Sequence, residues 1–147
     1  MQQVIDVLQR RRKLGFIILA FVALLGYLSH LYYPLLPPTF IESDWHMPLV
    51  YFLLGYKVIE LFIFYFILYQ RPISKFLKSE KDENALKKLE KKTKKFFFLV
   101  PQGSIVFGIL SYKLAGSVLY LWIFLLIATI TLLIVNPNKL TTINKDN

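Results

Sequence analysis

The sequence contains no cysteine. This absence excludes a disulfide framework, a thiolate metal site and a lipid-modified cysteine, and it leaves the redox compartment open. Charged residues are also few, at 18% of the 147 residues, whereas 56% are hydrophobic and the mean hydropathy is +0.51. A soluble domain of this length cannot bury so much apolar surface. Lipid is therefore expected to be the main solvent of the protein.

Catalytic sequence patterns are missing as well. The chain has no GxSxG nucleophile elbow, no phosphate-binding loop and no dinucleotide-binding glycine pattern. Its two histidines, His30 and His46, both fall near the outer edge of the predicted bilayer, whereas two haem ligands would be stacked through it. We therefore predict that the protein is not an enzyme and has no cofactor.

Four apolar runs are long enough to cross a bilayer as helices. The hydrocarbon core is about 30 Å thick and needs about 20 helical residues. The runs are continuous, which favours helices over the alternating segments of a β-barrel. The sequence thus predicts an all-α membrane protein, a four-transmembrane-helix bundle forming one polytopic domain over 1–147, with spans at about 15–33, 48–69, 96–112 and 114–135.

Positive charge is concentrated in three segments between these runs. Sixteen of the 18 Lys and Arg residues lie at 10–13, in 71–95, and in the tail as Lys139 and Lys145. The positive-inside rule places all three segments in the cytoplasm, so both termini are predicted inside (N-in, C-in) and only Lys113 outside. The composition fits a bacterial cytoplasmic membrane, or an organellar inner membrane.

The first basic segment follows Val4, Ile5 and Leu8, which have helical spacing. This pattern is typical of a short interfacial helix over residues 1–13 that rests on an anionic leaflet. The alternative is that the basic residues serve only to set the topology.

The segment 71–95 is predicted to be a basic cytoplasmic loop between the second and third helices. Its ten basic and four acidic residues give a net charge of +6. Glu83 with Lys87, and Glu90 with Lys94, have the four-residue spacing that favours a solvated helix extending the third span. The loop is expected to touch anionic lipid head groups or to dock a partner protein. The lysines concerned are Lys87, Lys88, Lys91, Lys92, Lys94 and Lys95. No nucleic acid is expected, because aromatic residues do not alternate with the basic ones as a stacking surface requires.

The third run is interrupted by Pro101, Gln102, Gly103 and Ser104 in succession. Such a sequence predicts a kink or an unwound turn. A break of this kind is usually structural, although transporters use broken helices to expose backbone groups near the midplane. Ser104 and Gly108 are small residues four apart, which permits close packing of a neighbouring helix.

Two ionisable residues in the second run give the sharpest indication of a site. Lys57 and Glu60 are three residues apart near the middle of the span, and therefore share one helical face. Either charge alone costs about 2.5 to 3.5 kcal/mol there, so the two are expected to pair. Gln102 and Ser104 could complete an intramembrane polar cluster. The pair could be a proton relay, an ion site or a contact with a partner subunit, or it could simply fix the rotation of the helix.

A second group of polar residues lies at the predicted outer face. His30, Glu42, Asp44 and His46 are weak candidates for a zinc site, because histidine and carboxylate are common zinc ligands. However, there is no HExxH motif and no paired histidine spacing. An interfacial loop anchored by Trp45 is the simpler interpretation, with Asp44 as a cap of the second helix.

The second run also carries a family resemblance. Its sequence LLGYKVIEL, residues 53–61, is similar to the Gly-x-x-x-x-Glu-Leu stretch of small four-helix membrane proteins of the DoxX-like kind. The resemblance covers one helix. The long basic loop departs from the short connection expected in that family, so membership is not assigned.

Two functions are compatible with these features. The first is a non-enzymatic accessory, assembly or regulatory component of a larger membrane complex, which binds another membrane protein through its helix faces and basic loop. The alternative is a small transporter or channel with a midplane site at Lys57 and Glu60. Such a protein would have to form a homo-oligomer, because four helices enclose little space.

Overall fold

The computed structural model describes residues 1–79 and 82–141 of the chain. These residues form helices joined by short connections, and the described ranges contain no strand. Four helices are long and apolar enough to cross a membrane, which confirms the all-helical prediction and indicates a membrane location. In chain order the elements are α1 (Gln2–Tyr32), α2 (Ser43–Phe64), the π-helical segment η1 (Tyr65–Gln70), α3 (Arg71–Lys78), α4 (Glu83–Ala115) and α5 (Val118–Ile134).

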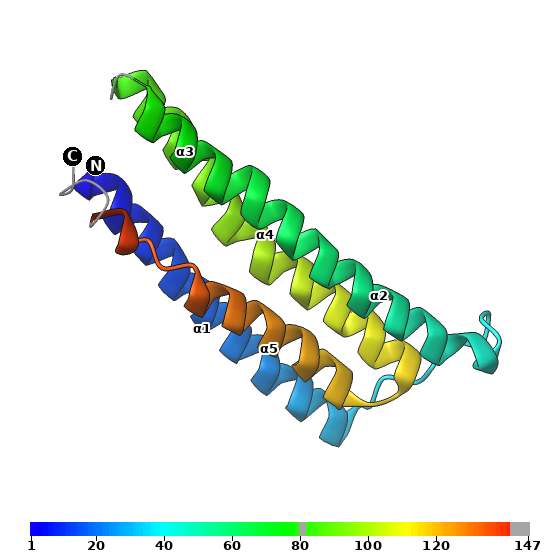
Figure 1. Ribbon diagram of the computed structural model, residues 1–147. Helices are drawn as coiled ribbons and strands as arrows, with labels where there is room; N and C mark the ends of the chain where they lie inside the picture. Colours follow the sequence, from blue (N-terminus) through cyan, green and yellow to red (C-terminus); the bar gives the residue numbers. More distant parts are fainter. Residues whose placement is uncertain (80–81, 142–147) are drawn as a thin grey trace.

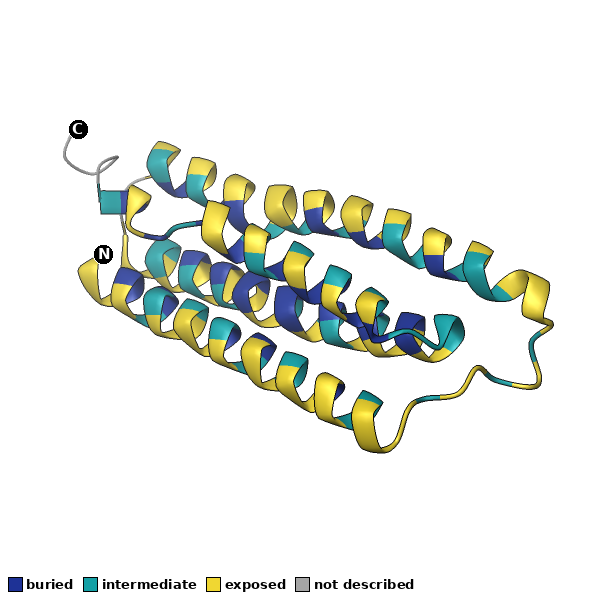
Figure 2. Ribbon diagram, turned by 90° about the horizontal axis from the view of Figure 1, so that it is seen from below, coloured by how far each residue is buried: buried dark blue, intermediate teal, exposed yellow. Residues whose placement is uncertain are grey.

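Helix α4 lies at the centre of the bundle. It packs against α1, α2 and α5, and α1 also packs against α5 (Figure 1). Helix α2 packs mainly on α4, so one flank of α2 is left uncovered. Figure 2 shows this flank, and the outer face of α1, as largely exposed residues.

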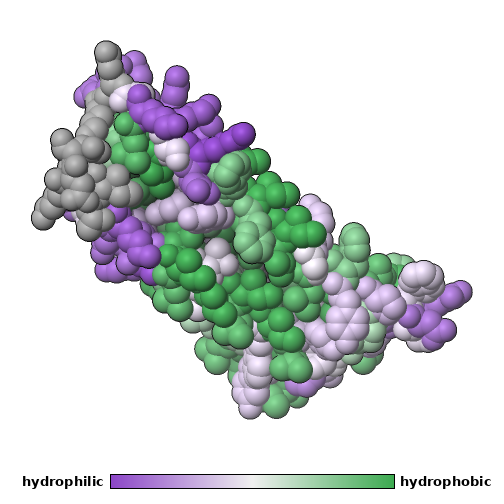
Figure 3. Space-filling model, in the orientation of Figure 1, coloured by the Kyte–Doolittle hydropathy of each residue, from purple (hydrophilic) through white to green (hydrophobic). Residues whose placement is uncertain are grey.

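The two ends of the bundle differ in polarity. The N-terminus, α3, the start of α4 and residues 135–141 after α5 all lie at one end, which we call the basic end (Figure 1). On the face seen in Figure 3, hydrophilic side chains gather at this end and, in smaller number, at the opposite end. Apolar side chains form the belt between them, as expected where hydrocarbon surrounds a protein.

Helix α1 is longer than the predicted span of 15–33. It begins at Gln2 and continues without a break through the basic residues 10–13. Val4, Ile5 and Leu8 are buried in the same core cluster as Leu140. The interfacial-helix hypothesis for residues 1–13 is therefore wrong, because these apolar side chains pack inside the bundle instead of facing lipid.

The predicted loop 71–95 is mostly helical. Helix α2, η1 and α3 form one continuous helix from Ser43 to Lys78, which extends beyond both ends of the predicted span 48–69. Helix α4 starts at Glu83, where the Asp82 carboxylate accepts a hydrogen bond from the Glu83 amide at 2.7 Å. The third span, predicted at 96–112, is thus the apolar part of a 33-residue helix. A solvated extension of this helix was expected from the charge spacing.

The expected break at Pro101 does not take the form of an unwound turn, because α4 is helical throughout residues 101–104. Pro101 is buried beside α1, where a Cβ added to Gly15 would stand 3.8 Å from Pro101 Cγ. Neighbouring helices commonly make a proline tolerable within a membrane helix.

The irregular turn lies in η1 instead. The Arg71 amide donates to the carbonyl of Phe66, five residues back, directly before Pro72. Proline has no amide donor, and its ring clashes with the carbonyl four residues earlier. A π-helical turn relieves this clash by shifting the hydrogen-bonding register.

Helices α4 and α5 form a tight antiparallel hairpin. Helix α4 extends to Ala115, so residues 114 and 115 belong to it rather than to the fourth span predicted at 114–135. Gly116 ends α4 with φ of 67°, in the left-handed region that favours glycine. A Cβ on Gly108 would stand 2.8 Å from the Leu121 side chain and 3.3 Å from the Leu121 carbonyl oxygen. Gly108 therefore permits the close helix packing that its spacing from Ser104 predicted.

Candidate functional site

Lys57 and Glu60 form an ion pair on α2. Lys57 Nζ donates to Glu60 Oε2 at 2.6 Å, which is a short charge-assisted hydrogen bond. The Lys57 side chain is 0% exposed and the Glu60 side chain 18% exposed. The spacing of three residues places both side chains at the seam between α2 and α4.

Helix α4 supplies the surface against which the ammonium packs. A Cβ on Gly103 would lie 2.5 Å from Lys57 Nζ and 3.6 Å from Glu60 Oε2, so a larger residue here would require the end of the Lys57 side chain to move. The Phe107 ring, one turn further along α4, has its centroid 5.6 Å from Lys57 Nζ, within the range of a cation–π contact. The Tyr56 and Phe107 rings form a T-shaped pair with their centroids 5.7 Å apart.

The hydrogen bonding of the pair is incomplete on both sides, because the ammonium has three donors and the carboxylate has two oxygens. Among the described residues, Glu60 is the only hydrogen-bond partner of the Lys57 ammonium, and Glu60 Oε1 has none. The pair is neutral overall and can keep both groups ionised in a low dielectric. Glu60 Oε1 is left for a further donor, and the Glu60 side chain is partly exposed.

The other two residues of the predicted polar cluster do not join the pair. Gln102 is exposed and makes no hydrogen bond to either partner. Ser104 is buried, yet its hydroxyl has no hydrogen-bond partner in the described chain. Ser104 lies one turn before Gly108, which faces α5, so it belongs to the α4–α5 side of the helix. The neighbouring Gly103 is the α4 residue that meets the pair.

The four candidate metal ligands are placed separately. His30 Nδ1 lies 3.0 Å from the Tyr112 hydroxyl, and His46 Nε2 lies 3.0 Å from the carbonyl of Ile41. Glu42 is the N-cap residue of α2, and Asp44 falls in the first turn, two positions beyond the N-cap, so it does not have the capping role expected of it. Within residues 1–79 and 82–141, no three His, Cys, Asp or Glu side chains come together as a metal site would require.

Tyr112 organises the end of the bundle opposite the basic end. Its buried hydroxyl contacts His30 and accepts a hydrogen bond from the Leu35 amide at 3.3 Å. It therefore ties α1 and the following connection to α4. The sequence analysis did not identify Tyr112, because a tyrosine near the end of an apolar run resembles an ordinary interfacial residue.

The lysines of the predicted loop lie on the first turns of α4. Lys94 pairs with Glu90 at 2.5 Å, as its spacing predicted. The remaining five are exposed to solvent, namely Lys87, Lys88, Lys91, Lys92 and Lys95.

Arg12 has a role that the charge pattern alone did not indicate. Its guanidinium donates from Nε to the Leu132 carbonyl at 2.6 Å and from Nη2 to the Leu133 carbonyl at 3.3 Å. One turn earlier, Gln9 donates to the side-chain oxygens of Asn136 and Asn138. We call these contacts the α1–α5 latch. The Arg12 contacts satisfy carbonyls in the last turn of α5, where a helix leaves its carbonyls without partners.

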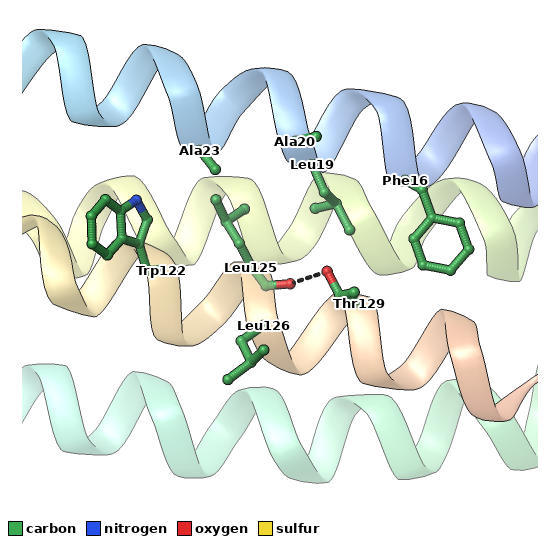
Figure 4. Close-up of a pocket in the computed structure, with 8 residues that line it drawn as sticks. All are labelled: Phe16, Leu19, Ala20, Ala23, Trp122, Leu125, Leu126 and Thr129. Carbon is green, nitrogen blue, oxygen red and sulfur yellow. Dashed lines mark hydrogen bonds between the residues drawn. The ribbon is translucent and has the colours of Figure 1, made fainter.

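A groove of about 450 Å³ lies between α1 and α5 within the apolar belt (Figure 4). Its only side-chain hydroxyl, that of Thr129, donates back to the Leu125 carbonyl at 2.8 Å. The groove is otherwise apolar and offers no group for catalysis or ion binding. Its lining consists of Phe16, Leu19, Ala20, Ala23, Trp122, Leu125, Leu126 and Thr129.

Comparison of the chain with protein-family models, with curated proteins and with solved structures finds no match. Function is therefore argued from the geometry of the chain itself.

Proposed function

We propose that this protein is a non-enzymatic accessory or assembly component of a larger membrane complex. In this proposal it resides in the cytoplasmic membrane of a bacterium, with both termini and the basic end on the cytoplasmic side. The observation that supports the proposal is the Glu60 carboxylate. It lies at mid-depth in the longest apolar helix, is partly exposed, and has one oxygen without a hydrogen bond from the described chain.

A carboxylate oxygen without a hydrogen bond at this depth in the membrane requires a hydrogen-bond donor. Lipid tails cannot hydrogen-bond, so polar atoms inside the bilayer pair with other protein groups or with confined water. The flank of α2 around Glu60 exposes large apolar side chains, among them Phe52, Ile59 and Ile63. A transmembrane helix that packs on this flank and presents a hydroxyl, amide or ammonium group would satisfy both features.

The exposed face of α1 provides a contrast. Its large exposed side chains at membrane depth, such as Ile17, Phe21 and Leu24, are purely apolar. Lipid covers such a surface without penalty. The α2 flank is distinguished by its carboxylate and not by its hydrophobicity.

The small transporter or channel remains the second candidate, because the pair is ionisable and one of its groups is partly exposed. Its geometry is less favourable. Lys57 is fully enclosed at the α2–α4 seam, and the groove between α1 and α5 is apolar. A permeation path would require a second copy of the chain on the α2 flank.

Site-specific photo-crosslinking in the native membrane distinguishes these functions. A photo-reactive phenylalanine analogue would replace Ile63 on α2, which is 49% exposed and lies one turn from Glu60, and in a matched control Phe21 on α1, which is 59% exposed. We expect one different membrane protein to be captured in stoichiometric amount from position 63 and not from position 21. Adding Lys57→Met with Glu60→Leu, which removes both charges together, should abolish the capture while the bundle still folds.

Three results would contradict this proposal of an accessory role through Glu60. Capture of the same chain at position 63 would indicate a homo-oligomer and favour the transporter. Equal capture at both positions would indicate non-specific contacts. Retention of the partner after removal of the charged pair would show that Glu60 has no part in docking.

A further inference from the structure

A second pocket, of about 600 Å³, lies at the basic end between α3 and the first turns of α4. Lys75 reaches it from α3, and Lys88 and Lys92 reach it from α4. Its apolar lining is formed by Pro72, Phe76 and Leu89, which are all buried. The pocket therefore combines a basic rim with an apolar floor.

The local sequence explains how this pocket arises. The π-helical turn before Pro72 carries α3 onward beside α4, so that Phe76 is buried in the same region as Leu89. On α4 the lining positions 85, 88, 89 and 92 recur every three or four residues and so share one face of the helix. Lys87, Lys91 and Lys95 do not line the pocket.

The end of the pocket at Lys92 lies at the depth of the lipid head groups, and Lys88, one turn earlier on α4, lies about 6 Å further from the apolar belt. Lys92 precedes Phe96, where the apolar part of α4 begins, by four residues, or about 6 Å of helix. The interfacial layer on each side of the hydrocarbon core is about 5 to 8 Å thick. Lysine side chains reach further along the membrane normal by extending their alkyl stems.

The charge of the lining favours an anion. In the described ranges, Lys75, Lys88 and Lys92 form no ion pair with a carboxylate. The one acidic residue of the lining, Asp82, is engaged as the N-cap of α4. The Asn84 side chain adds an amide to the lining.

We propose that this pocket binds the phosphate of an anionic membrane lipid, with the glycerol backbone resting on Phe76 and Leu89. A soluble phosphate ester carries the same charge, but it gains nothing from the apolar floor. The proposal is independent of the accessory role, because it concerns a different helix pair and a different class of ligand.

The test uses the full-length protein in a neutral detergent, with phosphatidylglycerol and phosphatidylcholine as probes and native mass spectrometry as the readout. The pocket variant carries Lys75→Gln, Lys88→Gln and Lys92→Gln. The matched control carries Lys87→Gln, Lys91→Gln and Lys95→Gln, which removes the same charge from positions that do not line the pocket. Each well-placed lysine contributes about fivefold to binding of an anionic lipid.

We expect the wild-type protein and the control to retain phosphatidylglycerol in preference to phosphatidylcholine, and the pocket variant to bind phosphatidylglycerol at least about tenfold more weakly. An equal loss in both variants would indicate diffuse attraction and overturn the proposal, as would no loss in either. Glycerol 3-phosphate, added as a competitor, should displace the lipid only at a large excess. Displacement at an equimolar concentration would show that the site recognises a soluble phosphate ester.

Discussion

At the scale of single residues, Gly103 is the α4 residue that faces the ion pair of α2. The notch left by Gly103 allows the Lys57 ammonium to lie against the α4 backbone and still reach Glu60 at 2.6 Å. Gly55 on α2 provides a natural comparison, because a Cβ added there would meet no other atom within 4 Å. Both residues lie within helices of the apolar belt.

We predict that Gly103→Ala stabilises the protein less than Gly55→Ala does. The new methyl group would stand 2.5 Å from Lys57 Nζ, so the end of this flexible side chain must shift, which weakens its contact with Glu60. The weakened contact offsets part of the gain of about 1 kcal/mol from replacing glycine in a helix, whereas Gly55→Ala keeps the whole gain. Thermal unfolding in detergent measures the difference. Melting temperatures that rise equally for the two variants would refute the role assigned to Gly103.

The sequence predicts the pair but not its surroundings. Lys57 and Glu60 are three residues apart on one helix, so their contact follows from helical periodicity alone. Which α4 residue meets them depends on the rotation of a second helix, which no local pattern specifies. Gln102 and Gly103 are adjacent in sequence yet about 100° apart around α4. Gln102 was expected beside the Lys57–Glu60 pair because it is polar, and Gly103 is the residue observed there.

At the scale of elements, the α1–α5 latch uses Arg12, one of the basic residues that predict the topology, to hold two helices together. Arg10, Arg11, Arg12 and Lys13 are equivalent for the positive-inside rule, but only Arg12 reaches the carbonyls at the end of α5. A cation at a helix C-terminus is also favoured by the helix dipole.

We predict that Arg12→Gln lowers the free energy of unfolding by about 1 to 2 kcal/mol, because it removes a charge-assisted contact to otherwise unpaired carbonyls. The exposed neighbour Arg11 serves as the control, since Arg11→Gln makes the same change in net charge. Chemical denaturation in mixed micelles measures both variants. If the two lose equal stability, net charge and not the latch is responsible.

The ends of the helices were the least predictable elements. The four apolar runs specify the four membrane helices, because their length and hydropathy match the bilayer. The extension of α1 back to Gln2 and of α4 back to Glu83 depends on contacts made outside the apolar belt. The π-helical turn before Pro72 was missed for a related reason, since a proline at the end of a span also fits a helix that simply stops.

At the scale of the whole molecule, the absence of cysteine offers a direct test of orientation. Single variants Ser43→Cys and Asn84→Cys place one thiol at each end of the bundle, and both positions are exposed. We predict that a membrane-impermeant maleimide labels position 43 in intact cells and position 84 only after permeabilisation, because the positive-inside rule keeps the basic end inside. The reverse pattern would invert the proposed topology and move the lipid pocket to the other leaflet.

The α1–α5 latch also sets an order of events during biosynthesis. Arg12 and its acceptor Leu132 are separated by 120 residues, which corresponds to roughly 6 to 24 seconds of translation. Throughout that interval the guanidinium of Arg12 must be satisfied by water or lipid phosphate, while α1, α2 and α4 enter the membrane ahead of their last partner. The bundle can close at the basic end only after α5 has left the ribosome. A nascent chain arrested before Leu132 is therefore an open three-helix intermediate, in which the surface of α4 that later receives α5 is still free for an insertion factor to hold.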